Sequence, residues 1–174
     1  MEALMMDEVE TVLHDFYDGA GEVHGIIYAM YVLEGGQPSP LYIGKAGKFG
    51  KKGDNLSANL KDIRVTGQHP FARWGYNYAY HMGDLSRVVL EHDGTPSPKY
   101  VRWADALFVR GGERYTRRLK EPVFFWAKAW REGDVGPWMD FGPTSLTFLE
   151  YQVIGVTSAG FPRLLNEEGA ERYR

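Results

Sequence analysis

The sequence predicts an α+β protein in which a small antiparallel sheet is flanked by helices and carries inserted loops and strands. Two apolar stretches, residues 25–33 and 41–43, are separated by turn residues, which is typical of a β-hairpin. Apolar side chains recur at helical spacing in the later part of the chain, so strands come first and helices follow. The 174 residues, 44% of them hydrophobic and 25% charged, suit one globular domain with a sizeable core.

The N-terminal segment is predicted to be an acidic helix. Residues 6–17 are amphipathic, and their apolar side chains recur at helical spacing: Val9, Val12, Leu13 and Phe16. Gly19 and Gly21 are expected to end this helix. The first 22 residues hold seven acids and no Lys or Arg. We therefore divide the chain into an acidic N-terminal helical arm, residues 1–22, and a larger domain, residues 23–174.

The hairpin follows directly after this arm. Residues 25–33 form an apolar run rich in Ile, Tyr and Val, which favours a buried strand. Residues 34–40 have the Gly and Pro content of a turn, and residues 41–43 supply a second short strand. Glycines at positions 44, 47, 50 and 53 then indicate a loop.

The middle of the chain is expected to contain a short helix and two inserted strands. Residues 56–63 favour the helix, and the stretch at 71–81 is unusually aromatic. Residues 86–91 and 100–110 are rich in Val, Leu and aromatic side chains, which predicts a strand in each. Gly and Pro residues between them indicate a turn.

Three helices are expected in the last part of the chain. Residues 113–121 and 123–131 are each predicted to be helical, with a proline interrupting between them. A further helix is expected after Thr144 or Ser145, either of which suits the N-cap position. Gly155 is expected to end that helix, whose apolar positions are Leu146, Leu149, Val153 and Ile154.

Charge is unevenly distributed along the chain. The net charge is −3, but residues 23–174 carry 20 basic and 16 acidic groups, a net of +4. The cations gather in two clusters, residues 45–64 and 110–131, and clustered cations attract polyanions such as nucleic acids. A solvated loop and a solvated helix face are the alternative interpretations. The candidate nucleic-acid-binding residues are Lys48, Lys51, Lys52, Arg64, Arg117 and Arg118.

Several functional classes are disfavoured by composition. The absence of cysteine excludes disulfides, thiolate nucleophiles and Cys-based metal sites. No apolar run approaches the ~18 residues that a membrane span needs. The acidic N-terminus has no charged-then-apolar leader, so we expect a cytoplasmic protein with no membrane partner. The glycine loop lacks the Gly-Lys-Ser/Thr ending of a nucleotide-binding P-loop.

The two hairpin strands carry the most specific motifs. Residues 25–28 have the sequence Gly-Ile-Ile-Tyr, and residues 41–45 have the sequence Leu-Tyr-Ile-Gly-Lys. Together they resemble the paired motifs of the GIY-YIG nuclease superfamily. Further features follow in the order of that family: an Arg in the aromatic stretch, Glu150 on a late helix, and then Pro162 and Asn166. The resemblance covers residues 24–166, which is most of the chain.

The resemblance implies a metal-dependent endonuclease that hydrolyses phosphodiester bonds in DNA. One Mg²⁺ (or Mn²⁺) per site would be held by Glu150, because hard cations prefer oxygen ligands. Tyr28 would position or deprotonate the attacking water, and Lys45 would lower the pKa of a nearby tyrosine. Tyr42 and Asn166 would support these groups through hydrogen bonds. An arginine would hold the phosphate through its fork of donors.

The motifs differ from the family pattern in three places. An ungapped match puts Ile27 where the first tyrosine of the family motif belongs. A slip of one residue moves a strand side chain to the opposite face of the sheet. We assign the role to Tyr28, which implies that the glycine of the motif is shifted by one position. The segment soon after the second motif has no arginine; the candidates are Arg73, which we prefer, and Arg64. A His or Tyr often follows that arginine, and here His81 would be the proton shuttle, with Asn77 and Tyr78 as alternatives.

Alternative interpretations apply to each candidate. Tyr28 and Tyr42 have the character of core strand aromatics, and Glu150 that of a half-exposed helical acid. The chain would then be a catalytically weak module that binds nucleic acid or a protein partner. For the nuclease, the expected partner is double-stranded DNA. One active site that cuts both strands needs a dimer or two encounters, so a homodimer is a further hypothesis.

Overall fold

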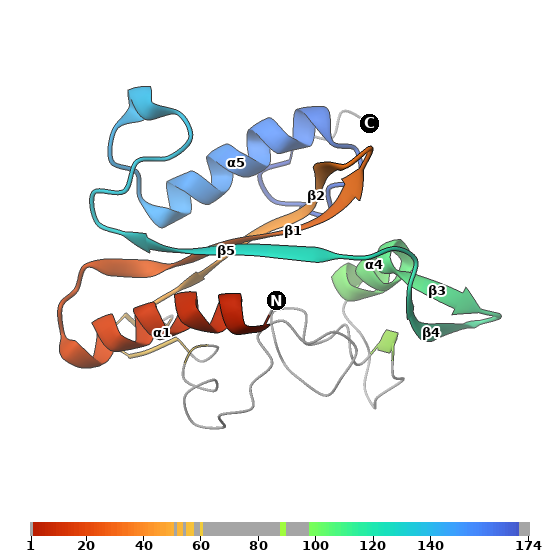
Figure 1. The fold of residues 1–174 in the computed structure, drawn as a ribbon, viewed down its shortest axis with the longest axis horizontal. Helices are drawn as coiled ribbons and strands as arrows, with labels where there is room; N and C mark the ends of the chain where they lie inside the picture. Colours follow the sequence, from red (N-terminus) through yellow and green to blue (C-terminus); the bar gives the residue numbers. More distant parts are fainter. Residues whose placement is uncertain are drawn as a thin grey trace.

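The computed structural model describes residues 2–50, 52–53, 55–57, 60, 88–89 and 98–170. These residues form an α+β fold, as the sequence predicts (Figure 1). The elements are, in chain order, α1 (Glu2–Asp18), β1 (Val23–Glu34), β2 (Gln37–Gly47), α4 (Pro98–Leu107), β3 (Phe108–Gly111), β4 (Arg114–Leu119), β5 (Phe124–Arg131), the short 3₁₀ helix η1 (Met139–Phe141) and α5 (Leu146–Gly160).

A three-stranded antiparallel sheet with the order β2-β1-β5 forms the centre of the fold. Helix α1 packs against β1 and β5, and α5 packs against β2 and β1 (Figure 1). Strands β3 and β4 form a separate two-stranded sheet that follows α4. The predicted hairpin is confirmed as β1 and β2, although both strands are longer than their apolar stretches.

Strand β1 contributes to a core on each face of the sheet, because successive strand side chains point to opposite faces. Ile26 and Met30 lie in the core that includes Val12 of α1. Ile27 lies in a second core with Leu149 of α5. Both faces of β1 are therefore covered, which explains why its sequence is an almost continuous apolar run.

The predicted strand at 100–110 is wrong over most of its length, since α4 occupies Pro98–Leu107 and only β3 is extended. The buried side chains of α4 are Trp103, Ala104 and Leu107, which is helical spacing. The Val and aromatic residues have a high strand propensity, but burial of this face of the helix outweighs that propensity. Val88 and Val89, inside the strand predicted at 86–91, are buried and helical as well.

The helices predicted at 113–121 and 123–131 are also wrong, because these segments form β4 and β5. Gly112 has a φ of +73°, a conformation that favours glycine, and it turns the chain between β3 and β4. In β5 burial alternates along the strand, with Phe125 and Ala127 buried between exposed neighbours. Burial of every second residue is the pattern of a strand. The alanines of this segment, which favoured a helix, are small residues that face the core.

The predicted helices at the two ends of the chain are confirmed. The Ser145 hydroxyl accepts a hydrogen bond from the backbone N–H of Phe148 (3.3 Å), so Ser145 is the N-cap of α5. Helix α5 continues past Gly155 to Gly160, so the predicted end was too early. In α1 the buried Val9 and Leu13 belong to the core, and α1 docks on the sheet as a plain amphipathic helix.

Candidate functional site

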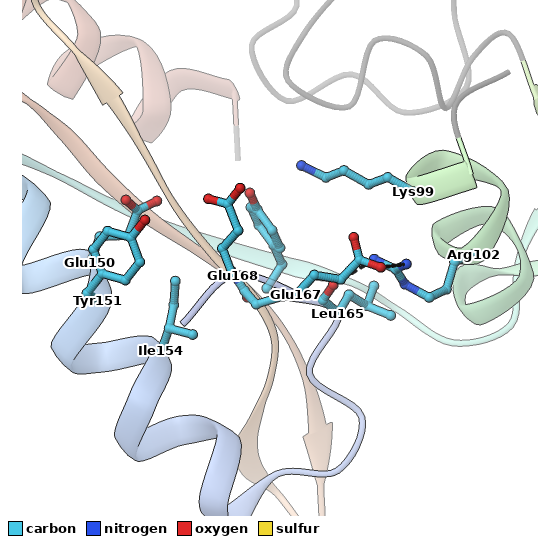
Figure 2. Close-up of a pocket in the computed structure, with 10 residues that line it drawn as sticks. Lys99, Arg102, Glu150, Tyr151, Ile154, Leu165, Glu167 and Glu168 are labelled. Carbon is cyan, nitrogen blue, oxygen red and sulfur yellow. Dashed lines mark hydrogen bonds and ion pairs between the residues drawn. The ribbon is translucent and has the colours of Figure 1, made fainter. Parts of the chain in front are cut away.

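A pocket of about 200 Å³ lies beside β2, an outer strand of the sheet (Figure 2). Three segments far apart in sequence meet there: β2, α4, and α5 with the chain that follows it. The pocket is lined by Tyr42, Lys99, Arg102, Glu150, Tyr151, Ile154, Leu165, Asn166, Glu167 and Glu168. Two cations, three carboxylates and two phenols thus converge on one small concave surface. Three sequence-predicted site residues, Tyr42, Glu150 and Asn166, are among them.

The two motif tyrosines lie on the same face of the hairpin. In the register of β1 and β2, Tyr28 pairs with Gly44 and Met30 pairs with Tyr42. The Tyr28 and Tyr42 ring centroids are 6.1 Å apart. Ile27 lies on the opposite face, in the core under α5. The register therefore makes Tyr28, and not Ile27, the partner of Tyr42.

Tyr28 is completely buried, whereas Tyr42 is only partly buried and reaches the pocket. Gly44 makes this arrangement possible. A Cβ atom at Gly44 would lie 2.6 Å from the Tyr28 ring and 2.7 Å from the Tyr42 ring, so both rings use the space above the glycine. Because the two rings are neighbours and only Tyr42 reaches the pocket, Tyr28 acts on the pocket through Tyr42.

The Tyr42 phenol holds its proton strongly. Burial raises its pKa to about 12, assisted by the negative charge of Glu150, while the neighbouring Tyr28 phenol acts in the opposite direction. The pKa of Tyr42 is raised, and not lowered as expected from Lys45, whose ammonium contacts Thr147 and Glu150 of α5. Tyr42 is a neutral hydrogen-bond donor near neutral pH.

Glu150 lies on α5 and is mostly buried. The Nζ atom of Lys45 is 3.5 Å from its Oε2 atom, and the same ammonium donates to the hydroxyl of Thr147. Burial raises the pKa of Glu150, the interactions with Lys45 oppose that shift, and the negative charge of Glu168 adds to it. Within the described ranges, no group of three His, Cys, Asp or Glu side chains is placed to hold a metal ion.

Asn166 is buried and uses its amide on the backbone of β2. It accepts a hydrogen bond from the N–H of Ile43 (2.9 Å) and donates one to the carbonyl of Ile43 (2.8 Å). The neighbouring N–H of Leu165 donates to the carbonyl of Leu41 (2.7 Å). The chain after α5 is therefore attached to β2 on both sides of Tyr42, and Asn166 holds that strand in place.

Lys99 and Arg102 of α4 line the pocket and are absent from the sequence-based candidates. The Lys99 ammonium extends from α4 into the pocket, as Figure 2 shows. Arg102 forms an ion pair with Glu167 and donates to the carbonyl of Leu165 (3.2 Å). Both were missed because residues 100–110 were predicted to be a strand. The signal was a proline followed by cations three residues apart, which suits one face of a first helical turn.

The remaining predicted residues divide into three groups. Lys48 is a correction: it is buried and paired with Asp15, so it presents no surface to a phosphate. Lys52 is exposed and Arg118 is exposed on β4, and neither lines the pocket; Arg117 belongs to β4. Four predicted residues lie outside the described ranges: Lys51, Arg64, Arg73 and His81.

A second cavity of about 400 Å³ lies between α5 and the sheet. It is lined largely by apolar side chains, among them Trp126, Trp130 and Leu149, and no acidic or basic side chain contributes to it. Of these two cavities, the one beside β2 is the one lined by acidic and basic side chains.

No family model, curated protein or solved structure matches this chain. Among the described residues, no helix has the length and apolar character needed to cross a bilayer.

Proposed function

We propose that this protein is a metal-dependent endonuclease that hydrolyses phosphodiester bonds in DNA. The observation that carries the proposal is the meeting of Tyr42 and Glu150 in one pocket with two cations. Tyr42 belongs to the Tyr-Ile-Gly motif and Glu150 to the late helix, which are the two positions that the resemblance pairs. We further propose that the enzyme is cytoplasmic and acts on double-stranded DNA. Because one pocket of this size admits one strand, we propose that it cuts both strands as a homodimer.

The roles of the pocket residues follow from their protonation states. Tyr42, with a pKa of about 12, is suited to donate a hydrogen bond to a phosphate oxygen or to the attacking water rather than to act as a base. Tyr28 is a positioning residue that orients Tyr42. Lys45 holds the carboxylate of Glu150 toward the pocket from the side of β2.

The residues present fit one divalent ion, because Glu150 is a mostly buried carboxylate whose pKa is raised. A nearby cation of double charge would relieve that unfavourable burial. Glu150 would be the protein ligand, and Glu168 is a further carboxylate that lines the pocket and acts on the pKa of Glu150. When bound, Mg²⁺ or Mn²⁺ supplies Lewis-acid stabilisation of the phosphoryl oxygens.

A second candidate function is a catalytically weak module that binds nucleic acid or a protein partner. The observation that favours it is the complete burial of Tyr28, which keeps that phenol from direct contact with a substrate. The ion pair of Glu150 with Lys45 is also a sufficient structural reason for an acid at that position.

Cleavage of plasmid DNA in the presence of Mg²⁺ or Mn²⁺ separates the two candidates. We expect the wild-type protein to nick or cut, and Y42F and E150Q to lose activity by about 100-fold or more. Y31F and E132Q are matched controls, since Tyr31 stacks on Phe124 and Glu132 is exposed, both outside the pocket. A wild-type protein that binds DNA but is inert with every divalent ion would favour the binding module.

A further inference from the structure

Among the described residues that line the pocket, Lys99 is the cation without an ion-pair partner. Arg102 is paired with Glu167 and Lys45 is paired with Glu150. By contrast, among the described residues no carboxylate lies within ion-pair distance of Lys99, although the side chain is about half-buried. A partly buried charge without a counter-ion is costly, and such groups are concentrated at functional sites.

Aromatic rings hold Lys99 in place. Its Nζ atom lies 5.0 Å from the ring centroid of Trp103, 5.1 Å from that of Tyr42 and 5.6 Å from that of Tyr100. Trp103 is completely buried, so one wall of this cage is rigid core. Cation–π contacts stabilise an ammonium without neutralising it. The full positive charge of Lys99 is therefore available to an anion that enters the pocket.

The groups around Lys99 have opposing effects on its pKa. Burial lowers the pKa of Lys99 and the charge of Arg102 lowers it further, while Glu167, Glu168 and Glu150 raise it. A bound anion would favour the protonated amine and replace the missing counter-ion. In Figure 2, Lys99 extends from α4 over the pocket while Glu150 comes from α5, so a ligand between them would meet a cation and a carboxylate.

We infer that Lys99 binds the phosphate group of the substrate, between the Tyr42 phenol and the Glu150 carboxylate. The inference rests on the proposed function and assigns to α4 the phosphate-binding cation that the motif comparison sought in Arg73 or Arg64. A compact ammonium contacts one phosphate oxygen as a point charge. Arg102 has a different task, because it ties the chain after α5 to α4 through Glu167 and Leu165.

The first test compares K99M, K99R and K128M for DNA cleavage with Mg²⁺. Met keeps the apolar stem of Lys99 against the rings, and Arg restores the charge. Lys128 is an exposed cation of β5 that lines neither cavity, so K128M is a matched control. We expect K99M to lose about 100-fold in kcat/KM, in the range for removal of one charge-stabilising donor, with partial recovery in K99R and a much smaller loss in K128M. K99M activity equal to that of K128M would overturn the inference and leave the nuclease proposal intact.

The second test uses inorganic phosphate and does not require cleavage. Phosphate that binds the folded state raises Tm, with sodium chloride at matched ionic strength as the baseline. We expect a phosphate-dependent rise in wild type, K99R and K128M, and none in K99M. When the wild type is also inert on DNA, either of two results overturns the inference. One is an equal rise in Tm for K99M and wild type, and the other is no rise in Tm for any of the proteins. An inert wild type with a rise that depends on Lys99 refutes the nuclease and retains the phosphate site.

Discussion

Gly44 shows how a single residue determines the spacing within the site. The Tyr28 and Tyr42 rings occupy the space where a side chain at position 44 would lie, so any Cβ atom forces the two rings apart. We expect G44A to destabilise the protein by about 1–3 kcal/mol, the usual cost of overpacking a filled site. Chemical denaturation would measure the change in the free energy of unfolding.

The neighbouring strand residue Gly47 provides the matched control for G44A. A Cβ atom at Gly47 would find its nearest neighbour at 3.6 Å, an ordinary contact. We expect G47A to be close to neutral, and G44A to cost less when Tyr28 is replaced by Leu, because the two positions are coupled. Equal costs for G44A and G47A would contradict the close approach of Tyr28.

Asn166 is the second residue whose effect can be predicted from local geometry. N166A leaves the N–H and the carbonyl of Ile43 without their partner at a buried position. We expect a loss of about 1–3 kcal/mol in the free energy of unfolding, the usual penalty for unsatisfied buried polar groups. E167A, next in sequence, removes an exposed carboxylate and should cost below about 1 kcal/mol. If N166A is as mild as E167A, Asn166 does not secure β2.

At the level of elements, the hairpin and the terminal helices were predictable because their patterns are local. The apolar run of β1 and the spacing of Leu146 and Leu149 in α5 each fit one period. Strand β5 was not predictable in this way. Its residues Phe-Phe-Trp-Ala-Lys-Ala-Trp-Arg contain alanines that suit a helix, and the choice of a strand depends on pairing with β1, about 100 residues earlier in the chain.

Helix α1 is joined to the sheet by a buried ion pair. Asp15 of α1 pairs with Lys48, and its carboxylate also accepts from the N–H of Glu22 (2.9 Å). Removing one partner leaves the other charge buried and uncompensated. We expect K48M to cost about 3–5 kcal/mol at neutral pH and the double variant D15N/K48M to cost less. Urea denaturation of both variants against wild type would measure this coupling.

The same pair makes stability depend on pH. Burial raises the pKa of Asp15, but the hydrogen bonds from Lys48 and from the backbone outweigh burial, and the net pKa lies below its ordinary value. A lowered pKa contributes stability that is fully present above the unfolded-state pKa of about 3.9 and is lost as pH falls through the folded-state value. The stability gap between wild type and D15N/K48M should therefore narrow below about pH 4. A gap that is constant down to pH 3 would contradict this role of Asp15.

At the scale of the whole molecule, the candidate site is assembled from segments that no local pattern connects. Tyr42, Glu150 and Asn166 were identified because the motifs that resemble the GIY-YIG family place them in order along the sequence. Lys99 was missed because its position in the pocket depends on α4, which packs Trp103 against the Tyr42 ring at a centroid distance of 4.5 Å. Contacts of that kind follow from the tertiary fold. Motif spacing therefore located the pocket residues on β2, α5 and the chain after α5, whereas the residues on α4 depend on packing.

The separation of charge between α1 and the rest of the chain leads to a prediction for DNA affinity. Asp7, Glu10 and Asp18 are exposed on α1, whose opposite side is buried in the core with Val9 and Val12. The variant D7N/E10Q/D18N changes the net charge from −3 to 0 without touching that core. If α1 is a plain docked helix, stability should change by less than about 1 kcal/mol, because exposed helix charges contribute little.

If the protein binds DNA as proposed, the salt dependence of binding shows whether the acids of α1 compete with DNA. Binding of a DNA duplex in Ca²⁺, measured by fluorescence anisotropy from low to moderate salt, should be modestly tighter for this variant at every salt concentration. The slope of log K against log salt should stay equal to that of wild type, because the slope counts the phosphates neutralised by protein cations. A slope steeper by about one or more would mean that the acids of α1 had masked cations of the binding surface, and that α1 regulates DNA access.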